Sequence, residues 1–436
     1  MTIFSEPART VPVVESTDVL VAGGGPAGVM AAIAAARRGA RVRLIEAHGA
    51  LGGIWTTGCL PHIIEIHREG LMAELLDRLD RAGAGARRGR ESVFQPTDDA
   101  PCRCDFDVET SKVVLDQMAT EAGVAVRLYT RVSAVYRDAA GRIETVVTDS
   151  KSGREAWRAK LFVDCTGDGD LAAQAGCGFD LGQPETGRCQ PMSMMALLAG
   201  AGRPDQPPFS IREWGPNKAW ILAELRRAGH EPSYAHPTMF LVREGYIVMM
   251  ANHGYGYRGP DAQVLTDATV RGRAENLAIV QRLRGLGGPW ANLELMAQSA
   301  QIGVRESRRI HGLYRVTRDD LVRGARFDDA VCRVSFCVDI HALDPAQGKG
   351  IDASGVKVQP YDIPLRALIA RDAPNLMMAG RCISGEFPAH ASYRITGVAA
   401  ALGEAAGRVA GAAIQRGADP RDVPFAEIAG ERRRPE

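Results

Sequence analysis

The sequence has no excess of charge, few aromatic residues and no long apolar run. Lysine plus arginine number 53 against 52 aspartate plus glutamate, and aromatic residues make up 6% of the 436 positions. This balance argues against binding nucleic acid or an acidic membrane surface through bulk charge. No segment approaches the roughly 18 consecutive apolar residues of a transmembrane helix, and residues 1–15 lack the apolar centre of a secretory signal. The sequence therefore predicts a cytoplasmic protein without a membrane span or a nucleic-acid partner.

Cysteine is also scarce, and its placement is irregular. The nine cysteines are odd in number and scattered along the chain. Without a secretory signal the chain is expected in a reducing compartment, where disulfides are rare. Cys102 and Cys104 form a C-x-C pair with no matching second pair, so a zinc site is not expected. No metal site is predicted.

The segment Thr17–Glu46 has the order strand, glycine-rich turn, helix and strand. The apolar run Asp18–Ala22 is of strand type, Val29–Arg38 is rich in alanine and helix-forming, and Arg41–Ile45 is a second apolar strand. Glu46 closes the unit. This order is that of a βαβ unit, which either binds a dinucleotide or is a structural unit without a ligand.

Three glycines and one acid favour dinucleotide binding. Gly23, Gly25 and Gly28 have G-x-G-x-x-G spacing, and Glu46 follows at the distance expected for a ribose contact. The first glycine allows a tight turn, the second allows backbone to approach a pyrophosphate, and the third allows close packing of helix on strand. The helix start then offers N–H groups and a positive dipole end to the phosphates. A second such fingerprint is absent, because the glycine-rich segment Gly83–Gly89 has the wrong spacing and follows a helix.

Two helices and a series of short strands are expected next. Apolar periodicity predicts helices over Glu65–Ala82 and Val108–Ala122. The candidate inward positions of the second helix are Val113, Val114, Met118 and Ala122. Turn signals separate the strand-like runs that follow, which predicts a β-meander over Val124–Tyr129, Val132–Arg137, Ile143–Asp149 and Ala156–Cys165.

The composition changes after Gly176, where prolines and tryptophans become frequent. Helices are expected at Asn217–Ala228 and Thr266–Leu286. We interpret residues 179–328 as an inserted substrate lobe, which divides a nucleotide-binding domain into residues 1–178 and 329–436. Strand character returns at Asp329–His341.

The C-terminal segment predicts a strand, a turn and a long helix. Asn375–Ala379 is a buried-type strand, and the helix is expected over Gly397–Ile414 with Thr396 as its cap. Within the helix, glycines recur every four residues at 403, 407 and 411. They lower helix propensity but allow close backbone packing, which predicts a helix pressed against a sheet or a cofactor.

Three blocks of this chain resemble one known fold. They are VLVAGGGPAGVMAAIAAARRG…VRLIE, FVDCTGDGDLA and NLMMAGRCISG…SYRITGVAAALGEAAG. They are similar to the glutathione-reductase-type FAD fold, and specifically to the broad FAD-dependent oxidoreductase family related to succinate dehydrogenase and fumarate reductase flavoproteins. IGVRESRRIHGLY, VDIH and YDIPLRAL fit the same pattern, so the resemblance covers nearly the whole chain outside about 180–295. It implies an α/β fold: a Rossmann-like FAD-binding domain of parallel sheet plus β-meander, with an inserted α+β substrate lobe.

The resemblance also implies which residues hold FAD. The first glycine turn would bind the pyrophosphate, Glu46 the adenosine ribose, and the start of the C-terminal helix the flavin. The implied FAD-binding residues are Gly23, Gly25, Pro26, Ala27, Gly28, Glu46, Gly52, Gly53, Thr57, Gly58, Val132, Gly167, Asp168, Gly380, Arg381, Ser384, Gly397 and Val398. Covalent relatives attach FAD through a histidine shortly before the double glycine. His48 has a different spacing, so non-covalent binding is expected.

Hydride transfer to a flavin needs a substrate C–H bond held against N5 and a base that takes the accompanying proton. The expected catalytic residues are His341, His390, Arg305, Arg309 and Arg394. In the family pattern, arginines of the RESRR block bind carboxylates or other oxyanions. The alternative is that His341 is a satisfied structural histidine and that Arg309 belongs to an internal salt bridge.

The expected function is an FAD-dependent dehydrogenase or reductase that moves a hydride between a small organic substrate and flavin N5. A paired redox cysteine motif is absent, since Cys59 stands alone, which disfavours a dithiol relay. Two alternatives remain open. One is a flavin monooxygenase or halogenase-like enzyme, and the other is an electron-transfer or tRNA-modification subunit that acts only with partners. A homo-oligomer or a separate electron-transfer partner is compatible with each.

Overall fold

The computed structural model describes residues 3–65, 69–84, 103–201, 214–243, 245–352 and 355–429. Within these ranges, no helix is long and apolar enough to cross a bilayer. The expectations about the C-x-C pair and the glycine-rich segment from residue 85 onward lie outside the described residues and side chains. The compartment of the protein stays a prediction.

The central element is a mixed sheet of seven strands in the order β5-β2-β1-β8-β7-β6, with β19 also paired to β8. Five strands pair in parallel, and β6 and β7 are antiparallel. The strands are β1 (Val13–Ala22), β2 (Val42–Ile45), β5 (Ala125–Arg127), β6 (Arg131–Arg137), β7 (Ile143–Ser150), β8 (Gly153–Asp164) and β19 (Leu376–Met378). The predicted α/β class, a parallel sheet with a meander, is confirmed.

The meander has three strands instead of the four expected. β5 pairs in parallel with β2, through Arg43–Ile45, and lies at the opposite edge of the sheet from β6. A parallel neighbour requires a crossover connection, which α3 (Val108–Glu121) supplies directly before β5. The sequence signal for a strand was right, but its partner was wrong, because alternation does not encode which edge a strand joins.

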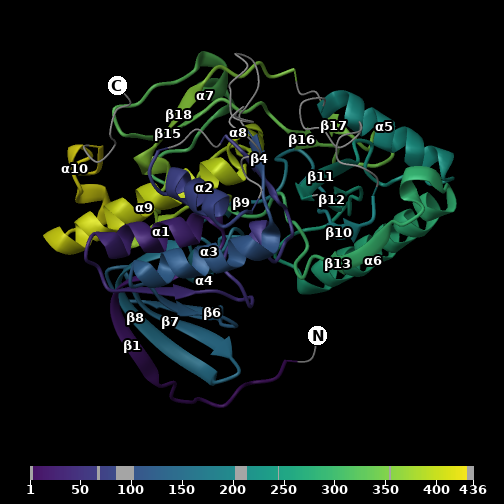
Figure 1. Ribbon diagram of the computed structural model, residues 1–436. Helices are drawn as coiled ribbons and strands as arrows, with labels where there is room; N and C mark the ends of the chain where they lie inside the picture. The colour runs from purple at the N-terminus through teal and green to yellow at the C-terminus, as the bar shows by residue number, and fades with distance from the viewer. Residues whose placement is uncertain are drawn as a thin grey trace.

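Two helices far apart in the sequence, α1 (Pro26–Arg37) and α9 (Thr396–Arg416), lie side by side (Figure 1). A Cβ built on Gly403 would lie 2.0 Å from the carbonyl oxygen of Ala27, and one on Gly407 would lie 2.1 Å from that of Ala31. Only glycine allows this approach of two backbones. The predicted close packing is present, but these glycines face a helix instead of a sheet or a cofactor.

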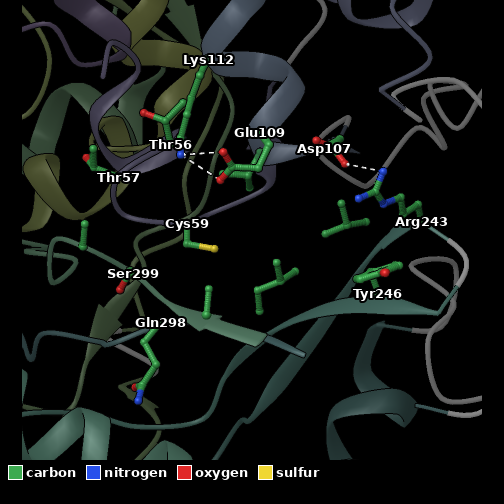
Figure 2. A pocket seen from close by; sticks show the side chains of 15 residues that line it. Thr56, Thr57, Cys59, Asp107, Glu109, Lys112, Arg243, Tyr246, Gln298 and Ser299 are labelled. Carbon is green, nitrogen blue, oxygen red and sulfur yellow. Dashed lines mark hydrogen bonds and ion pairs between the residues drawn. The ribbon is translucent and has the colours of Figure 1, made fainter. Parts of the chain in front are cut away.

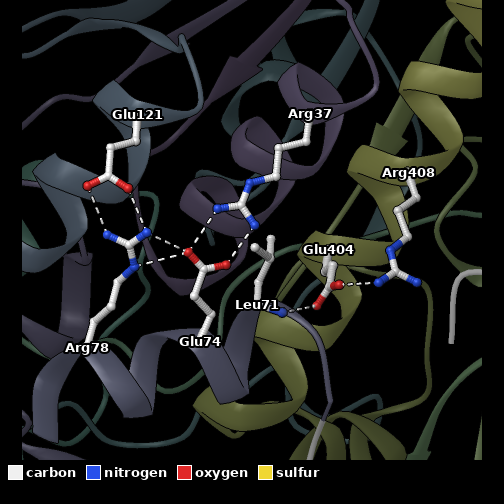
Figure 3. Close-up of polar contacts among 7 residues, drawn as sticks. All are labelled: Arg37, Leu71, Glu74, Arg78, Glu121, Glu404 and Arg408. Carbon is white, nitrogen blue, oxygen red and sulfur yellow. Dashed lines mark hydrogen bonds and ion pairs between the residues drawn. The ribbon is translucent and has the colours of Figure 1, made fainter. Parts of the chain in front are cut away.

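A polar network ties the helices on this side of the sheet together (Figure 3). Arg37 of α1 pairs with Glu74 of α2 (Leu71–Arg81) at 2.6 Å, and Arg78 of α2 bridges Glu74 to Glu121 of α3. Glu404 of α9 accepts a hydrogen bond from the N–H of Leu71 at 3.0 Å. A carboxylate from another helix therefore caps α2, which has no side-chain cap of its own.

Several predicted helix details need correction. The helix expected from Glu65 begins at Leu71, after Gly70 with φ +75°. In α3, Val114 and Met118 are buried as expected, but Val113 is 55% exposed because it lies on the solvent face. Thr396 is the first residue of α9 and not its cap, since Ile395 occupies the cap position without a side-chain hydrogen bond.

A second sheet lies beside the first unit, on the right in Figure 1. It is antiparallel, in the order β11-β12-β10-β13, and consists of β10 (Ala196–Ala199), β11 (Thr238–Arg243), β12 (Tyr246–Met250) and β13 (Glu294–Gln298). One face packs on the helices α5 (Trp214–Arg227) and α6 (Ala262–Gly285) through Leu198, Ile247 and Met249. The opposite face carries Phe240, Val242 and Val248. Both predicted helices of this region are present, whereas the lobe boundaries stay a prediction.

Shorter elements complete the described chain. The strand expected over Asp329–His341 is divided into two strands, β15 and β16, with different partners. The remaining elements are β3 (His62–Ile64) with β4 (Arg103–Asp105), β9 (Phe179–Asp180) with β14 (Arg309–Ile310), β15 (Ala330–Val334) with β18 (Tyr361–Pro364), β16 (Ile340–His341) with β17 (Ile351–Asp352), and the helices α4 (Asp170–Gln174), α7 (Arg318–Arg323), α8 (Phe387–Tyr393) and α10 (Ala426–Ala429).

The close contact between α1 and α9 predicts that one added methyl group at this contact destabilises the fold. Gly403→Ala should lower the free energy of unfolding by about 2 kcal/mol or more, because the helices must separate to admit the Cβ. Gly285→Ala in α6 is the matched control, since a Cβ there meets nothing within 4 Å. That control should be neutral or slightly stabilising. Chemical denaturation of both variants checks this, and equal stabilities would contradict the packing argument.

Candidate functional site

The glycine-rich turn before α1 combines a close-packed part with an open one. A Cβ on Gly28 would lie 1.7 Å from the carbonyl oxygen of Gly23, and one on Gly23, at φ +94°, would lie 2.4 Å from that of Cys165. A Cβ on Gly25, by contrast, meets nothing within 4 Å. The fold itself therefore requires glycine at 23 and 28. Gly25 instead leaves space open in front of the helix.

Two further predicted segments meet this turn. A Cβ on Gly53 would lie 2.9 Å from the Cα of Gly25, and the N–H of Gly52 donates to the carbonyl of Gly24 at 2.7 Å. A Cβ on Gly380 would lie 3.2 Å from the Cβ of Ala27. Together with Cys165, which lies against Gly23, these two segments surround the start of α1, whose first residue is Pro26.

Glu46 contacts the glycine turn itself. Its Oε2 accepts a hydrogen bond from the N–H of Gly24 at 2.5 Å, and its Oε1 accepts one from the N–H of His48 at 2.7 Å. The side chain is buried, and its carboxylate oxygens keep further lone pairs. Glu46 thus fixes the turn, and a ribose contact stays a prediction.

The turn after β8 is held beside Arg381. Oδ1 of Asp168 pairs with Nη2 of Arg381 at 2.9 Å, and a Cβ on Gly167 would lie 2.5 Å from the same nitrogen. Asp164, at the end of β8, fixes this turn by accepting hydrogen bonds from the N–H and Oγ1 of Thr166. Burial raises the pKa of Asp164 to about 6. Sequence reasoning missed Asp164, although its place at the end of a buried strand next to two glycines was a usable signal.

Three other predicted cofactor residues, Thr57, Gly58 and Ser384, make contacts within the protein that do not distinguish a cofactor role from a structural one. Thr57 Oγ1 contacts Gly53 O at 3.0 Å and Gln301 Oε1 at 2.9 Å, and thereby links the double-glycine loop to the second half of the chain. The N–H of Gly58 donates to the same Gly53 carbonyl at 3.0 Å. Ser384 is buried against Gly312.

The contacts of Val132, Gly397 and Val398 do not show whether these residues bind a cofactor. Val132 lies in β6, two residues after Thr130, whose N–H donates to the carbonyl of Glu46. Gly397 packs so tightly that a Cβ would lie 2.2 Å from the carbonyl oxygen of Ile64, and Val398 is fully buried. Their contacts with a cofactor stay predictions.

Three observations fit a dinucleotide in this cradle. Space is open at Gly25, and no side chain among the described residues caps the first N–H groups of α1. Nη1 of Arg381 is buried without a hydrogen-bond partner. Free N–H groups at a helix start and an unpaired guanidinium nitrogen are the donors that phosphate oxygens accept from.

A second group of predicted residues meets elsewhere. Asp339 pairs with Nη2 of Arg394 at 2.9 Å and with Nε2 of His341 at 3.3 Å. Arg305 donates to Pro191 O at 2.8 Å and to the Ser193 hydroxyl at 2.9 Å, and its charge acts on His341. The structure therefore brings together Arg305, His341 and Arg394 from three separate segments.

Three aromatic residues that the sequence analysis missed complete this cluster. His253 stacks on Tyr234 with ring centroids 3.9 Å apart, and it lies edge-on to His341 at 4.9 Å. Nδ1 of His253 contacts the hydroxyl of Tyr255 at 3.2 Å. His253 and Tyr255 belong to the segment Asn252–Tyr257, which reads NHGYGY, but no spacing rule identifies them as site residues. We call Tyr234, His253, Tyr255, Arg305, Asp339, His341 and Arg394 the charged cluster.

Burial keeps the histidines of the charged cluster neutral. It lowers the pKa of His341 to about 3, with the Arg305 charge adding to the effect, and holds the pKa of His253 well below its usual range. Burial would raise the pKa of Asp339, but the hydrogen bond from His341 and the neighbouring charges hold it below its usual value. At neutral pH the cluster therefore carries two guanidinium charges against one carboxylate.

Polar atoms of the charged cluster are left unpaired. His253 Nε2, His341 Nδ1 and Arg394 Nε are buried without hydrogen-bond partners among the described residues. Asp339 and Arg394 keep side-chain exposures of 17% and 11%, so the cluster is open to solvent on one side. Unpaired buried donors and acceptors beside a net positive charge are the features of a site for a small anion.

Arg309 and His390 do not join the charged cluster directly. Arg309 is 1% exposed and pairs with Glu306 at 2.5 Å, and it also donates to the carbonyls of Gly182 and Gly385. This arrangement favours the internal salt bridge that the sequence left as an alternative. His390 is fully buried in α8 beside Tyr393, and burial holds its pKa well below the usual range. Within the described residues, no group of three or more His, Cys, Asp or Glu is placed to hold a metal.

Residues 18–431 match the protein family described as FAD dependent oxidoreductase. Two curated proteins resemble parts of the chain. A 76-residue segment is 37% identical to dihydrolipoyl dehydrogenase of Trypanosoma brucei brucei, covering 17% of this chain and only 16% of that enzyme. An uncharacterized protein from the nifH2 5' region of Methanosarcina barkeri is 28% identical over 185 residues, which are 39% of this chain and 94% of its own length.

Two solved structures show a remote similarity. p-Nitrophenol 4-monooxygenase of Pseudomonas putida aligns over 95% of this chain and 84% of its own, with a TM-score of 0.49 and 15% identity. A geranylgeranyl bacteriochlorophyll reductase-like protein of Thermoplasma acidophilum aligns over 95% and 82%, with a TM-score of 0.44 and 15% identity. The expected relation to succinate dehydrogenase and fumarate reductase flavoproteins stays a prediction.

Replacing glycine by alanine is predicted to have different effects at Gly25 and at Gly28. Gly25→Ala should leave the apoprotein as stable as wild type, because its methyl group enters open space, but lower FAD affinity at least about tenfold by occupying room for the pyrophosphate. Gly28→Ala should destabilise the fold itself. Flavin retained on desalting, with thermal unfolding of each apoprotein, separates the two. Normal flavin affinity in Gly25→Ala would move the pyrophosphate elsewhere.

The buried histidines predict how stability changes with pH. Their folded pKa values lie below the unfolded value, so the unfolded chain binds more protons in acid and stability falls as the pH drops below about 6.5. Each of His253, His341 and His390 should add up to about 1.4 kcal/mol per pH unit to this slope. His341→Gln should make the slope shallower, whereas His48→Gln, at an exposed site, should not. Unfolding free energies at pH 5 to 7 provide the measurement, and identical slopes would refute it.

Proposed function

Because this chain belongs to the family of FAD-dependent oxidoreductases, we propose that it transfers a hydride between a small organic anion and N5 of its flavin. FAD is the cofactor of the family, and when bound it supplies a two-electron acceptor or donor. One observation supports this function above all: Arg305, His341 and Arg394, named from the sequence, lie in one charged cluster with unpaired buried polar atoms.

In this function the two arginines bind the anionic group of the substrate. Asp339 holds one end of the Arg394 guanidinium through its carbonyl at 2.8 Å and its carboxylate at 2.9 Å, which leaves Nε without a partner. Arg305 is fixed by Pro191 and Ser193 in the same way. A guanidinium that is already oriented loses little entropy when a carboxylate binds, and the hydrogen bonds to it are charge-assisted.

The two histidines supply bases for the proton that accompanies hydride transfer. Neutral His341 donates its Nε2 proton to Asp339, so its unpaired Nδ1 carries a lone pair. Tyr255 donates its hydroxyl proton to Ser233 O at 3.0 Å, and its oxygen therefore accepts from Nδ1 of His253. Nε2 of His253 then carries the second lone pair. Both tautomers follow from the partners of the rings, and each leaves a proton acceptor inside the site.

Anaerobic reduction of the bound flavin tests this function. The FAD-loaded protein is mixed with 2-hydroxy, 2-amino and saturated carboxylic acids, and with their amides, which lack the carboxylate, as controls. Bleaching of the flavin by an acid and not by its amide is the expected result. A parallel reaction in air tests the alternatives. Oxygen incorporated into its product would favour the monooxygenase or halogenase-like alternative, and activity only with a co-purified protein would favour the partner-dependent subunit.

Arg394→Lys should lower the rate of this bleaching about 100-fold, because lysine keeps the charge but loses the forked geometry. Arg315→Lys is the matched control, since that arginine pairs with Asp180 at 3.0 Å on the surface. Flavin absorbance must be equal in both variants, so that a lost rate is not a lost cofactor. Stopped-flow traces give the rates, and equal rates would remove Arg394 from substrate binding.

A further inference from the structure

A cavity of about 260 Å³ lies between the start of α3 and one face of the antiparallel sheet (Figure 2). Thr56, Thr57 and Cys59 line it on one side, and the sulfur of Cys59 points into it. Thr57 belongs to the double-glycine loop, which the resemblance places beside the flavin ring. No member of the charged cluster lines this cavity, so it is a separate site.

The charges at the cavity are paired with one another. Lys112 bonds to Glu109 at 2.8 Å, and Arg243 lies 3.5 Å from Asp107 and 4.8 Å from the ring centre of Tyr246. Two cations thus balance two anions, in contrast to the net positive charged cluster. An ionic ligand gains little here from the field of the lining residues, and an uncharged one loses nothing.

The rest of the lining is apolar or already hydrogen-bonded. Val108, Leu197 and Val242 form apolar walls. Thr56 donates its hydroxyl proton to Leu51 O at 2.5 Å, and burial raises the pKa of the Cys59 thiol to about 11, so this thiol stays neutral. The volume is near the lower end of the ~300–1,000 Å³ range of ligand pockets, which suits a compound of one or two rings.

The cavity and the charged cluster lie along the same face of the sheet. Tyr246, Val248 and Met250 alternate on one side of β12; Tyr246 lines the cavity, and Met250 Sδ lies 3.6 Å from Arg305. Four residues of strand span about 13 Å. One sheet face therefore offers a neutral apolar site at one end and a positively charged site at the other.

We propose that the cavity binds the second redox substrate, an uncharged quinone of one or two rings. This inference rests on the proposed function, because an enzyme that takes a hydride and a proton from an organic acid must pass them on. A quinone gains two electrons and two protons, becomes a hydroquinone and leaves the cofactor oxidised. A nicotinamide dinucleotide carries phosphate charges and exceeds this volume, whereas a quinone fits both the size and the neutral lining.

Binding is measured with the FAD-loaded protein and 2,3-dimethyl-1,4-naphthoquinone, whose ring positions are blocked against addition of thiols. The charged control is 2-hydroxy-3-methyl-1,4-naphthoquinone, which has the same rings and is an anion at neutral pH. Ligand-observed NMR should detect binding of the first compound and at least about tenfold weaker binding of the second. Equal binding of the two, or no binding of the first, would overturn the inference.

Two variants test whether the naphthoquinone binds in the cavity. Ala297→Trp places a ring in the cavity from an exposed lining position, and Val270→Trp, on the exposed face of α6, is the control. Ala297→Trp should weaken naphthoquinone binding, and slow its reoxidation of dithionite-reduced flavin, at least about tenfold. Val270→Trp should change neither, and equal effects of the two variants would contradict the site.

The proposed function and the cavity site can be refuted independently. Bleaching by an organic acid should be unchanged in Ala297→Trp, because that step uses the charged cluster. If naphthoquinone binds and reoxidises the flavin but no acid bleaches it, the proposed function fails while the cavity site stands. If acids bleach the flavin but naphthoquinone does not bind, the cavity site fails alone.

Discussion

The close contact between α1 and α9 is the constraint on which the cofactor cradle depends. The carbonyl oxygens of Ala27 and Ala31 lie so near Gly403 and Gly407 that no side chain fits between the helices. α1 begins at the glycine-rich turn, and Gly380, in the segment that follows β19, lies against Ala27 of the same helix, so this contact brings segments from both halves of the chain to the turn. The start of α1, where the glycine-rich turn lies, is held in place by this pair.

Local constraints made part of the fold predictable from sequence. A residue that needs positive φ or zero side-chain volume leaves glycine as its mark, so Gly23 and Gly28 identified the turn without any tertiary information. Helix periodicity located α3 and α6 within a few residues. Strand pairing was less accessible: β5 has the alternation of a strand, but its place beside β2 depends on a crossover that alternation does not encode.

The charged cluster shows where sequence reasoning reaches its limit. Arg305 and Arg309 belong to one motif, yet Arg309 pairs with Glu306 in the interior, while the charge of Arg305 lowers the pKa of His341. The difference depends on the carbonyls of Gly182 and Gly385, which distant segments bring to Arg309. His253 and Tyr234 had no motif at all, because their stacking is a property of the assembled lobe.

Electrostatics separates the two ends of the sheet face that both sites share. At one end, two guanidinium groups oppose a single carboxylate in a partly buried place, so an anion there replaces lost water with charge-assisted hydrogen bonds. At the other end, Lys112 and Arg243 are already paired, and an anion would lose its hydration without a free cation to meet it. Specificity is a difference between affinities, so the proposed acid substrate of the first site would be disfavoured at the second. The two proposed substrates, which differ in charge, would therefore not compete for the same end of the sheet face.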